Sequence, residues 1–185
     1  PSLVGSEMCI RDRLNMSDEE IKEITKIHIV ACGSAYHTGV TAKYVIEGLA
    51  RIPVEVDVAS EFRYRDPILQ KGNMVIVISQ SGETADTLAA LRESRERGFK
   101  VLGIVNVVGS SIAREADSVM YTWAGPEIAV ATTKAYSAQL TALYMLAMKF
   151  ARVRGTIDQE KFAGMLTDLR LSLIHISEPT RLGMI

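Results

Sequence analysis

Five short apolar runs recur along the chain, and each is followed by a turn and then by a helical pattern. Their continuous apolarity and their β-branched residues are typical of strands that are covered on both faces of a sheet. The runs occupy residues 27–31, 54–58, 74–78, 101–105 and 118–122. We therefore expect five short, buried strands.

Helix candidates lie between these runs, at residues 36–50, 84–97, 110–116 and 133–152. Ser17, followed by Glu20, is typical of a capped helix start and predicts a further helix through about residue 25. Strands that alternate with helices indicate a parallel sheet with right-handed crossovers. We expect the α/β fold class, as a three-layer α-β-α sandwich around a five-stranded parallel, doubly wound sheet.

The most apolar stretch, residues 135–150, still contains Ser137, Gln139, Thr141 and Lys149. It is too short and too polar for a membrane span, so a buried helix is the better interpretation. Because residues 136–150 are apolar nearly all round, we expect them to be buried beneath a neighbouring domain or subunit.

Composition narrows the class of protein. The 185 residues are 48% hydrophobic and 23% charged, with a net charge of −1, which fits one domain with a sizeable core. A near-neutral charge argues against a broad nucleic-acid-binding face. Cys9 and Cys32 are too few to define a disulfide framework, and nothing resembles a secretion signal. We expect a cytoplasmic protein that binds neither nucleic acid nor a membrane.

The two ends of the chain carry an unusual relation to one another. Codons for residues 7–13, read as the reverse complement in a shifted frame, encode residues 171–176, and the match extends outward from residues 4–7 to 177–180. No folding requirement produces complementarity at the DNA level, and the pattern resembles translated sequencing adapters. We expect non-native tails at 1–13 and 171–185 and one natural domain at 14–170, cut at both ends. Cys9, His175 and Pro179 then carry no functional information.

Two loops stand out as candidate ligand sites. Residues 32–35 read CGSA and residues 79–84 read SQSGET, and both precede a predicted helix. With strand order 2-1-3-4-5, these loops follow adjacent strands and lie side by side, where ligands bind in doubly wound sheets. Free backbone N–H groups, the helix dipole and the hydroxyl groups all favour an anion there.

The missing lysine limits which anion this is. No G-K-[ST] sequence for a nucleoside triphosphate is present, and the first loop lacks the G-x-G-x-x-G spacing of dinucleotide sites. A phosphate monoester held by hydroxyls and amides remains. Glu83 and Asp86 would repel it unless they point outward and stabilise the helix start. The alternative is that Ser81 and Thr84 merely cap a helix.

A third candidate segment is residues 125–137, in which residues 130–134 precede the apolar helix and are placed to complete a sugar-phosphate pocket. Residue types alone favour a plain helix cap by Thr132 or Thr133, with Lys134 exposed. Residues 61–66 have the character of an interdomain or ligand-facing turn, or equally of a surface with salt bridges.

Neither histidine of the natural domain offers a catalytic or metal-binding partner in the sequence. His28 alternates within a strand, and His37 lies in the first turn of a helix. Cys32 is better explained as a small buried residue than as a nucleophile. We expect no metal and no cofactor.

Five motifs in order carry a resemblance to a known family: ACGSAYHTG, VEVDVASEFRYRDP, ISQSGETADTLAALR, NVVGSSIARE and AGPEIAVATTKAYSAQL. Together they resemble the isomerase portion of the glutamine–fructose-6-phosphate aminotransferase (isomerizing) family, and in particular its first sugar isomerase (SIS) domain. The resemblance implies an SIS fold that binds fructose 6-phosphate. It places the substrate contacts at Gly33, Ser34, Ser79, Gln80, Ser81, Thr84, Val130, Ala131 and Thr132. Ala35 stands where the family often has serine, which removes one hydrogen bond worth about 1 kcal/mol.

The same resemblance implies a larger protein. In the family, a glutaminase domain supplies ammonia, and fructose 6-phosphate becomes glucosamine 6-phosphate for amino-sugar biosynthesis. The catalytic histidine, glutamate and lysines belong to a second SIS domain and a C-terminal tail, so we expect no catalytic residue in this chain. Its expected partners are those missing domains and a second copy in a homodimer. The chain alone is expected to bind sugar phosphate weakly and to catalyse nothing.

Two other functions compete with this one. A sugar-phosphate-sensing SIS domain of a transcription regulator would need a basic helix-turn-helix ahead of it, which residues 14–26 do not contain. A single-domain isomerase would need an acid–base pair, and none is evident. The EIAVATTK and SEFRY segments favour the aminotransferase.

Overall fold

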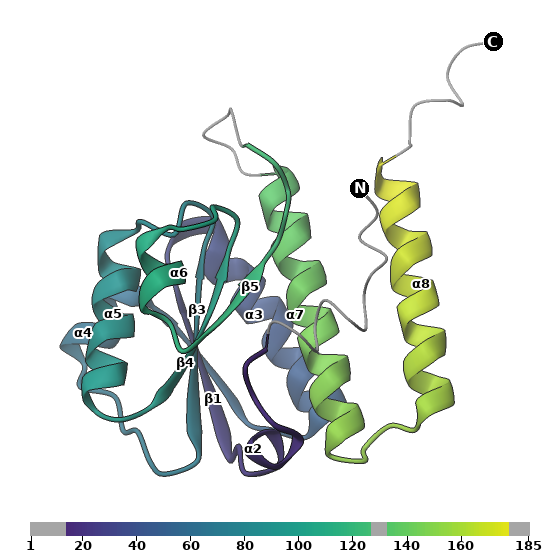
Figure 1. Cartoon of the computed structure of the whole chain (residues 1–185), viewed down its shortest axis with the longest axis horizontal. Helices are drawn as coiled ribbons and strands as arrows, with labels where there is room; N and C mark the ends of the chain where they lie inside the picture. Colours follow the sequence, from purple (N-terminus) through teal and green to yellow (C-terminus); the bar gives the residue numbers. More distant parts are fainter. Residues whose placement is uncertain (1–13, 127–132, 178–185) are drawn as a thin grey trace.

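The expected strands form one parallel sheet in the computed structural model, which describes residues 14–126 and 133–177, with side chains through residue 172 (Figure 1). The strands are β1 (Lys26–Ala31), β2 (Val54–Val58), β3 (Asn73–Ser79), β4 (Lys100–Val105) and β5 (Ser118–Tyr121). Their order is β2-β1-β3-β4-β5, and every neighbouring pair is parallel. The predicted strand order is therefore confirmed.

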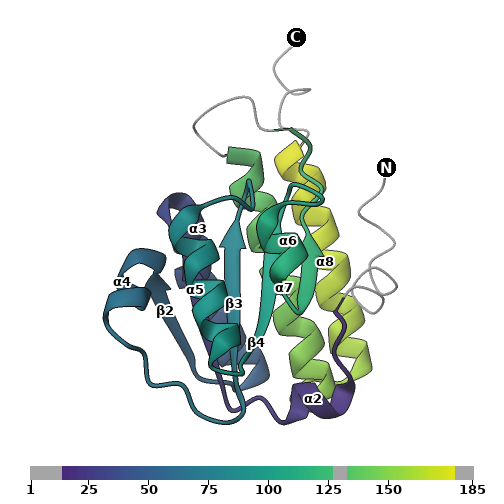
Figure 2. The same cartoon turned by 60° about the vertical axis from the view of Figure 1, so that its left-hand side comes forward.

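Helices cover both faces of this sheet, which confirms the three-layer sandwich. Figure 1 and Figure 2 show α4, α5 and α6 on one side and α3, α7 and α8 on the other. The helices are α2 (Asp18–Lys22), α3 (Gly33–Ala50), α4 (Ala59–Tyr64), α5 (Ala85–Glu96), α6 (Ser111–Glu115), α7 (Thr133–Val153) and α8 (Gln159–Ser177). None of these described helices is long and apolar enough to cross a membrane.

Alternation along the strands divides the core into two layers. Ile27 and Ile29 of β1 pack with the apolar faces of α3 and α7, whereas Val30 packs with α4 and α5. Successive side chains of a strand point to opposite faces, so a continuous apolar run supplies both layers at once. That is why β3 and β4 show no polar alternation, whereas the edge strand β2 alternates Val with Glu55 and Asp57 and is only partly buried.

Two helices differ from the expectation. Residues 61–66 were expected to form a turn, but α4 occupies Ala59–Tyr64 and buries Phe62 completely. Ala59 and Phe62 are three positions apart, which places both on the face of α4 that meets the sheet. The expected capping box joins Ser17 and Glu20, but its helix, α2, ends at Lys22 rather than near residue 25.

The apolar helix α7 is covered by its own chain rather than by a separate domain. It packs along α3 and against α2, α8 and β4. Leu143, Leu146 and Phe150 are fully buried in this layer. The expectation of a covering domain or subunit is therefore wrong for these residues.

The last helix crosses the expected boundary at residue 170 without a break. Phe162 is buried in the core, and Met165, Leu166 and Leu169 pack against it. Beyond the boundary, Leu171 is half exposed. The assignment of residues 171–185 to a non-native tail stays a prediction.

Candidate functional site

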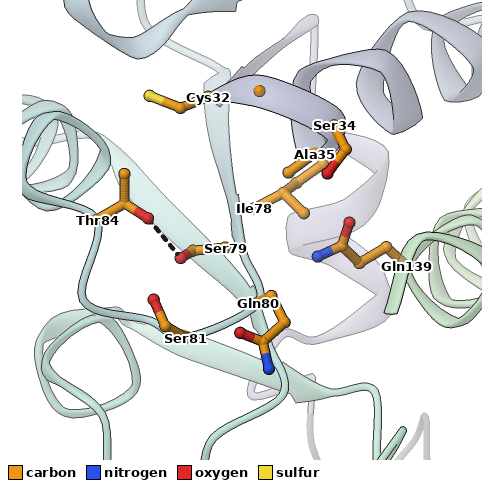
Figure 3. A pocket seen from close by; sticks show the side chains of 10 residues that line it. Cys32, Ser34, Ala35, Ile78, Ser79, Gln80, Ser81, Thr84 and Gln139 are labelled. Atoms are coloured by element: carbon orange, nitrogen blue, oxygen red, sulfur yellow. Dashed lines mark hydrogen bonds between the residues drawn. The ribbon is translucent and has the colours of Figure 1, made fainter. Parts of the chain in front are cut away.

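The two loops predicted to bind a ligand open onto one cavity at the carboxyl ends of β1 and β3. From these adjacent strands the chain continues into α3 on one face and α5 on the other, which leaves a crevice between them. The cavity has a volume of about 230 Å³ (Figure 3). It is lined by Cys32, Gly33, Ser34, Ala35, Ile78, Ser79, Gln80, Ser81, Thr84 and Gln139.

All the predicted site residues within the described part of the chain line this cavity, from Gly33 and Ser34 through Thr84. Val130, Ala131 and Thr132 lie outside the described residues. Just after them, Thr133 begins α7, and Lys134 is exposed and donates to the carbonyl of Pro126. Every described residue that lines the cavity has an uncharged side chain.

Hydroxyl groups of the second loop form a small network (Figure 3). The Oγ atom of Ser79 lies 2.9 Å from Oγ1 of Thr84 and accepts a hydrogen bond from the N–H of Gly82 at 3.0 Å. Only one of the two hydroxyl protons of Ser79 and Thr84 is used in the hydrogen bond between them. The other hydroxyl proton can be donated to a ligand. Ser81 accepts from the N–H of Glu83 at 3.2 Å, and its own proton can likewise be donated.

This network argues against the helix-cap alternative. Thr84 is the N-cap residue of α5, yet its side chain makes no capping hydrogen bond. Cys32, the N-cap of α3, makes none either. Neither N-cap side chain therefore bonds the start of its helix, and helix starts are where backbone N–H groups can donate to an anion.

Gly82 shapes the loop. Its φ of +70° lies in the left-handed region that glycine adopts without strain. A Cβ atom at this position would lie only 2.1 Å from Oγ of Ser110, so a side chain does not fit. The Gly82 carbonyl accepts from the N–H of Ile112 at 3.0 Å, and the Gln80 carbonyl accepts from the N–H of Asn106 at 3.1 Å. The loop is thus held from outside by the segments that follow β4.

The acidic residues Glu83 and Asp86 turn away from the cavity, which is the arrangement that a phosphate site requires. A carboxylate oxygen of Glu83 accepts from the N–H of Ser111 at 2.7 Å. Hydrogen bonds from Ser111 lower the pKa of Glu83, and the charge of Arg114 acts in the same direction. Glu83 therefore caps the start of α6 rather than α5. Asp86 lies 3.4 Å from Arg63. Neither acid places its charge in the cavity lining.

Sequence reasoning did not include Gln139 in the site. This residue of α7 is only 3% exposed and lines the cavity beside Ser34 and Ala35. Its polarity was visible within the apolar stretch at 135–150. Its role depends on how α7 crosses the end of the sheet, which the sequence does not reveal.

A second cluster was also missed. The register of β1 and β2 sets His28 opposite Glu55, and the ligand-capable atoms of His28, Glu55 and Asp57 lie within 4.8 Å of one another. Both carboxylates are already paired, since Lys26 lies 2.5 Å from Glu55, and Arg65 lies 2.5 Å from Glu55 and 2.7 Å from Asp57. We therefore interpret the cluster as charge balance along an edge strand. The sequence alone indicated no metal-binding partner for His28, whereas the structure places two carboxylates beside it.

Burial of His28 makes stability depend on pH. Burial lowers the pKa of its imidazole below the ordinary 6.5, and the charge of Lys26 acts in the same direction, whereas Glu55, Asn73 and Asp57 partly oppose the shift. The unfolded chain then takes up this proton first as the pH falls. We expect the unfolding free energy to decrease below about pH 6.5, with a slope of at most about 1.4 kcal/mol per pH unit from this group.

Urea unfolding at pH values from 5 to 7.5 measures this slope, above the range in which the carboxylates titrate. His28→Leu should flatten it, because Leu is of similar size and does not titrate. His37→Gln, at an exposed position of α3, serves as the matched control and should leave the slope unchanged. Equal slopes in the wild type and His28→Leu would contradict the assignment.

The sequence of this chain is similar to an SIS domain profile and to known aminotransferases. The sequence profile of the SIS domain matches residues 20–149. Glutamine–fructose-6-phosphate aminotransferase (isomerizing) of Caldanaerobacter subterraneus is 57% identical over 91% of this chain and 28% of the relative, and that of Clostridium tetani is 58% identical over 90% and 27%.

Among solved structures, the C-terminal domain of glucosamine-fructose-6-phosphate aminotransferase from Francisella tularensis superposes with a TM-score of 0.80. It is 42% identical, and the match covers 83% of this chain and 44% of that one. Measured against the two aminotransferases of Caldanaerobacter subterraneus and Clostridium tetani, this chain spans little more than a quarter of their length. Since the SIS profile covers well over half of the chain, the protein belongs to the SIS domain family.

Proposed function

We propose that this chain is the first SIS domain of a glutamine–fructose-6-phosphate aminotransferase, and that it binds fructose 6-phosphate through the phosphate group. The observation that carries the proposal is the meeting of residues 33–34 and 79–84 at one uncharged, hydroxyl-lined cavity. Relatives that are 57% and 58% identical carry this substrate in their names, which favours it over other phosphate monoesters.

Neutral donors hold the phosphate in this proposal. The hydroxyls of Ser81 and Thr84 donate to phosphate oxygens, together with N–H groups at the starts of α3 and α5. Each such bond is strengthened by the charge of the acceptor. Because no cation lines the described cavity, the ligand is held without a strong ion pair, and the affinity is modest enough for turnover.

The reaction itself needs more than this chain. The proposed activity of the whole protein converts fructose 6-phosphate, with ammonia from glutamine, into glucosamine 6-phosphate. Because this chain spans little more than a quarter of its relatives, we assign glutamine hydrolysis and proton transfer to a glutaminase domain and a second SIS domain, and we include a second copy of the chain as a partner in a homodimer. This chain binds and orients the substrate.

Calorimetric titration of the chain tests the proposal. Fructose 6-phosphate and glucosamine 6-phosphate should bind, whereas fructose without phosphate should bind at least about tenfold more weakly, because the charge-assisted hydrogen bonds are lost. No glucosamine 6-phosphate should form when ammonia is added. Equal binding of fructose and fructose 6-phosphate would contradict the proposal.

A further inference from the structure

A buried carboxamide, that of Gln139, lines the cavity. Gln139 is only 3% exposed, and none of the hydrogen bonds between described residues involves its carboxamide. A carboxamide has two N–H donors and an oxygen acceptor. The polar atoms of Gln139 face the cavity, so its hydrogen-bonding capacity is left for a ligand.

The direction of the side chain indicates what it serves. Figure 3 shows the carboxamide of Gln139 entering the cavity from α7. It lies across Ile78 and Ala35 from the hydroxyls of Ser79, Ser81 and Thr84. A ligand with its phosphate at those hydroxyls would therefore present its remaining atoms to Gln139.

We propose that Gln139 binds hydroxyl groups of the sugar and so discriminates a sugar phosphate from other phosphate monoesters. The inference rests on the proposed function and adds a residue to it. A neutral carboxamide suits a polyol, because it can donate to one hydroxyl and accept from its neighbour. The methyl group of Ala35 offers neither, and the carboxamide of Gln139 lies at this side of the cavity beside the hydroxyl of Ser34.

Binding measurements with three probes separate sugar recognition from phosphate recognition. Fructose 6-phosphate carries both features, whereas methyl phosphate and inorganic phosphate carry only the phosphate. Gln139→Leu should weaken fructose 6-phosphate about tenfold, as expected for the loss of one or two neutral hydrogen bonds, and should leave the other two ligands within about twofold. Gln139→Met, which keeps the length of the side chain, should behave in the same way.

Thermal unfolding of the unliganded variants distinguishes this role from a structural one. If Gln139 serves only a ligand, Gln139→Leu should be at least as stable as the wild type, because no hydrogen bond to a described residue is lost. Gln70→Leu, at an exposed position outside the cavity, is the control for the substitution itself and should leave all three affinities unchanged.

The outcomes of these binding measurements distinguish the role of Gln139 from the proposed function of the chain. Equal weakening of all three ligands by Gln139→Leu would place the residue in phosphate binding or in the structure of the cavity and would overturn the inference alone. Unchanged binding of fructose 6-phosphate would also overturn it. Failure of the wild type to bind any of the three probes would overturn the proposed function and the inference together.

Discussion

Gly82→Ala is expected to abolish measurable fructose 6-phosphate binding and to lower the unfolding free energy by about 2–5 kcal/mol. Two costs add. The left-handed backbone destabilises a residue with a side chain by about 1–2 kcal/mol, and overpacking against Ser110 destabilises the fold by about 1–3 kcal/mol more. Relief of the clash must move the loop that carries Ser81 and Thr84, and hydrogen bonds to phosphate tolerate little displacement.

Gly98→Ala is the matched control for this experiment. Gly98 has a φ of +83°, but a Cβ atom there would meet nothing within 4 Å. Gly98→Ala should therefore lose unfolding free energy only through the backbone strain, and it should bind fructose 6-phosphate like the wild type. Urea unfolding and calorimetric titration of both variants measure the two effects. Equal destabilisation of both, or normal ligand binding by Gly82→Ala, would contradict the role given to the contact with Ser110.

The double variant Ser81→Ala and Thr84→Val is expected to weaken fructose 6-phosphate and inorganic phosphate alike by at least about 100-fold. A hydrogen bond to a charged group contributes about 1.5–3 kcal/mol, which corresponds to roughly 10- to 150-fold in affinity for each hydroxyl. Both substitutions keep most of the side-chain volume, and neither hydroxyl caps α5. The loss should therefore appear in binding more than in folding.

Thr41→Val controls for the removal of a hydroxyl elsewhere. Thr41 is partly exposed on α3, and its hydroxyl donates to the carbonyl of His37. Titrations with both ligands should give affinities within about twofold of the wild type. If the double variant retained its affinity for inorganic phosphate, the hydroxyls would not be the phosphate donors.

Much of the fold could be predicted from local patterns because the three central strands, β1, β3 and β4, are buried on both faces. β-branched runs such as β3 have no polar face to interrupt them, and the Gly-Ser loops that follow β1 and β3 mark the switch point. α4 was missed because six residues are too few to show a helical period. Only its packing on the sheet reveals why Phe62 is apolar.

The candidate site likewise contains residues that local sequence patterns reveal and residues that only the tertiary structure reveals. The loop residues could be found because hydroxyls and glycine cluster within six positions of the sequence. Gln139 and the neighbours of His28 could not, since one depends on the path of α7 and the other on the register between β1 and β2. The hydroxyl of Thr84 was also ambiguous. Whether it caps α5 or bonds Ser79 depends on a loop conformation that Gly82 determines.

The central claim is that neutral donors around residues 33–34 and 79–84 hold the phosphate without a cation. An NMR titration of backbone amide signals with fructose 6-phosphate, at about 0.05 M and 0.5 M NaCl, tests it most directly. The account predicts the largest shifts at Gly33 and at the amides of residues 81–84, and an affinity that changes less than about threefold between the two salt concentrations, because no ion pair is screened. Shifts centred elsewhere, or a loss of affinity above about tenfold in high salt, would contradict it.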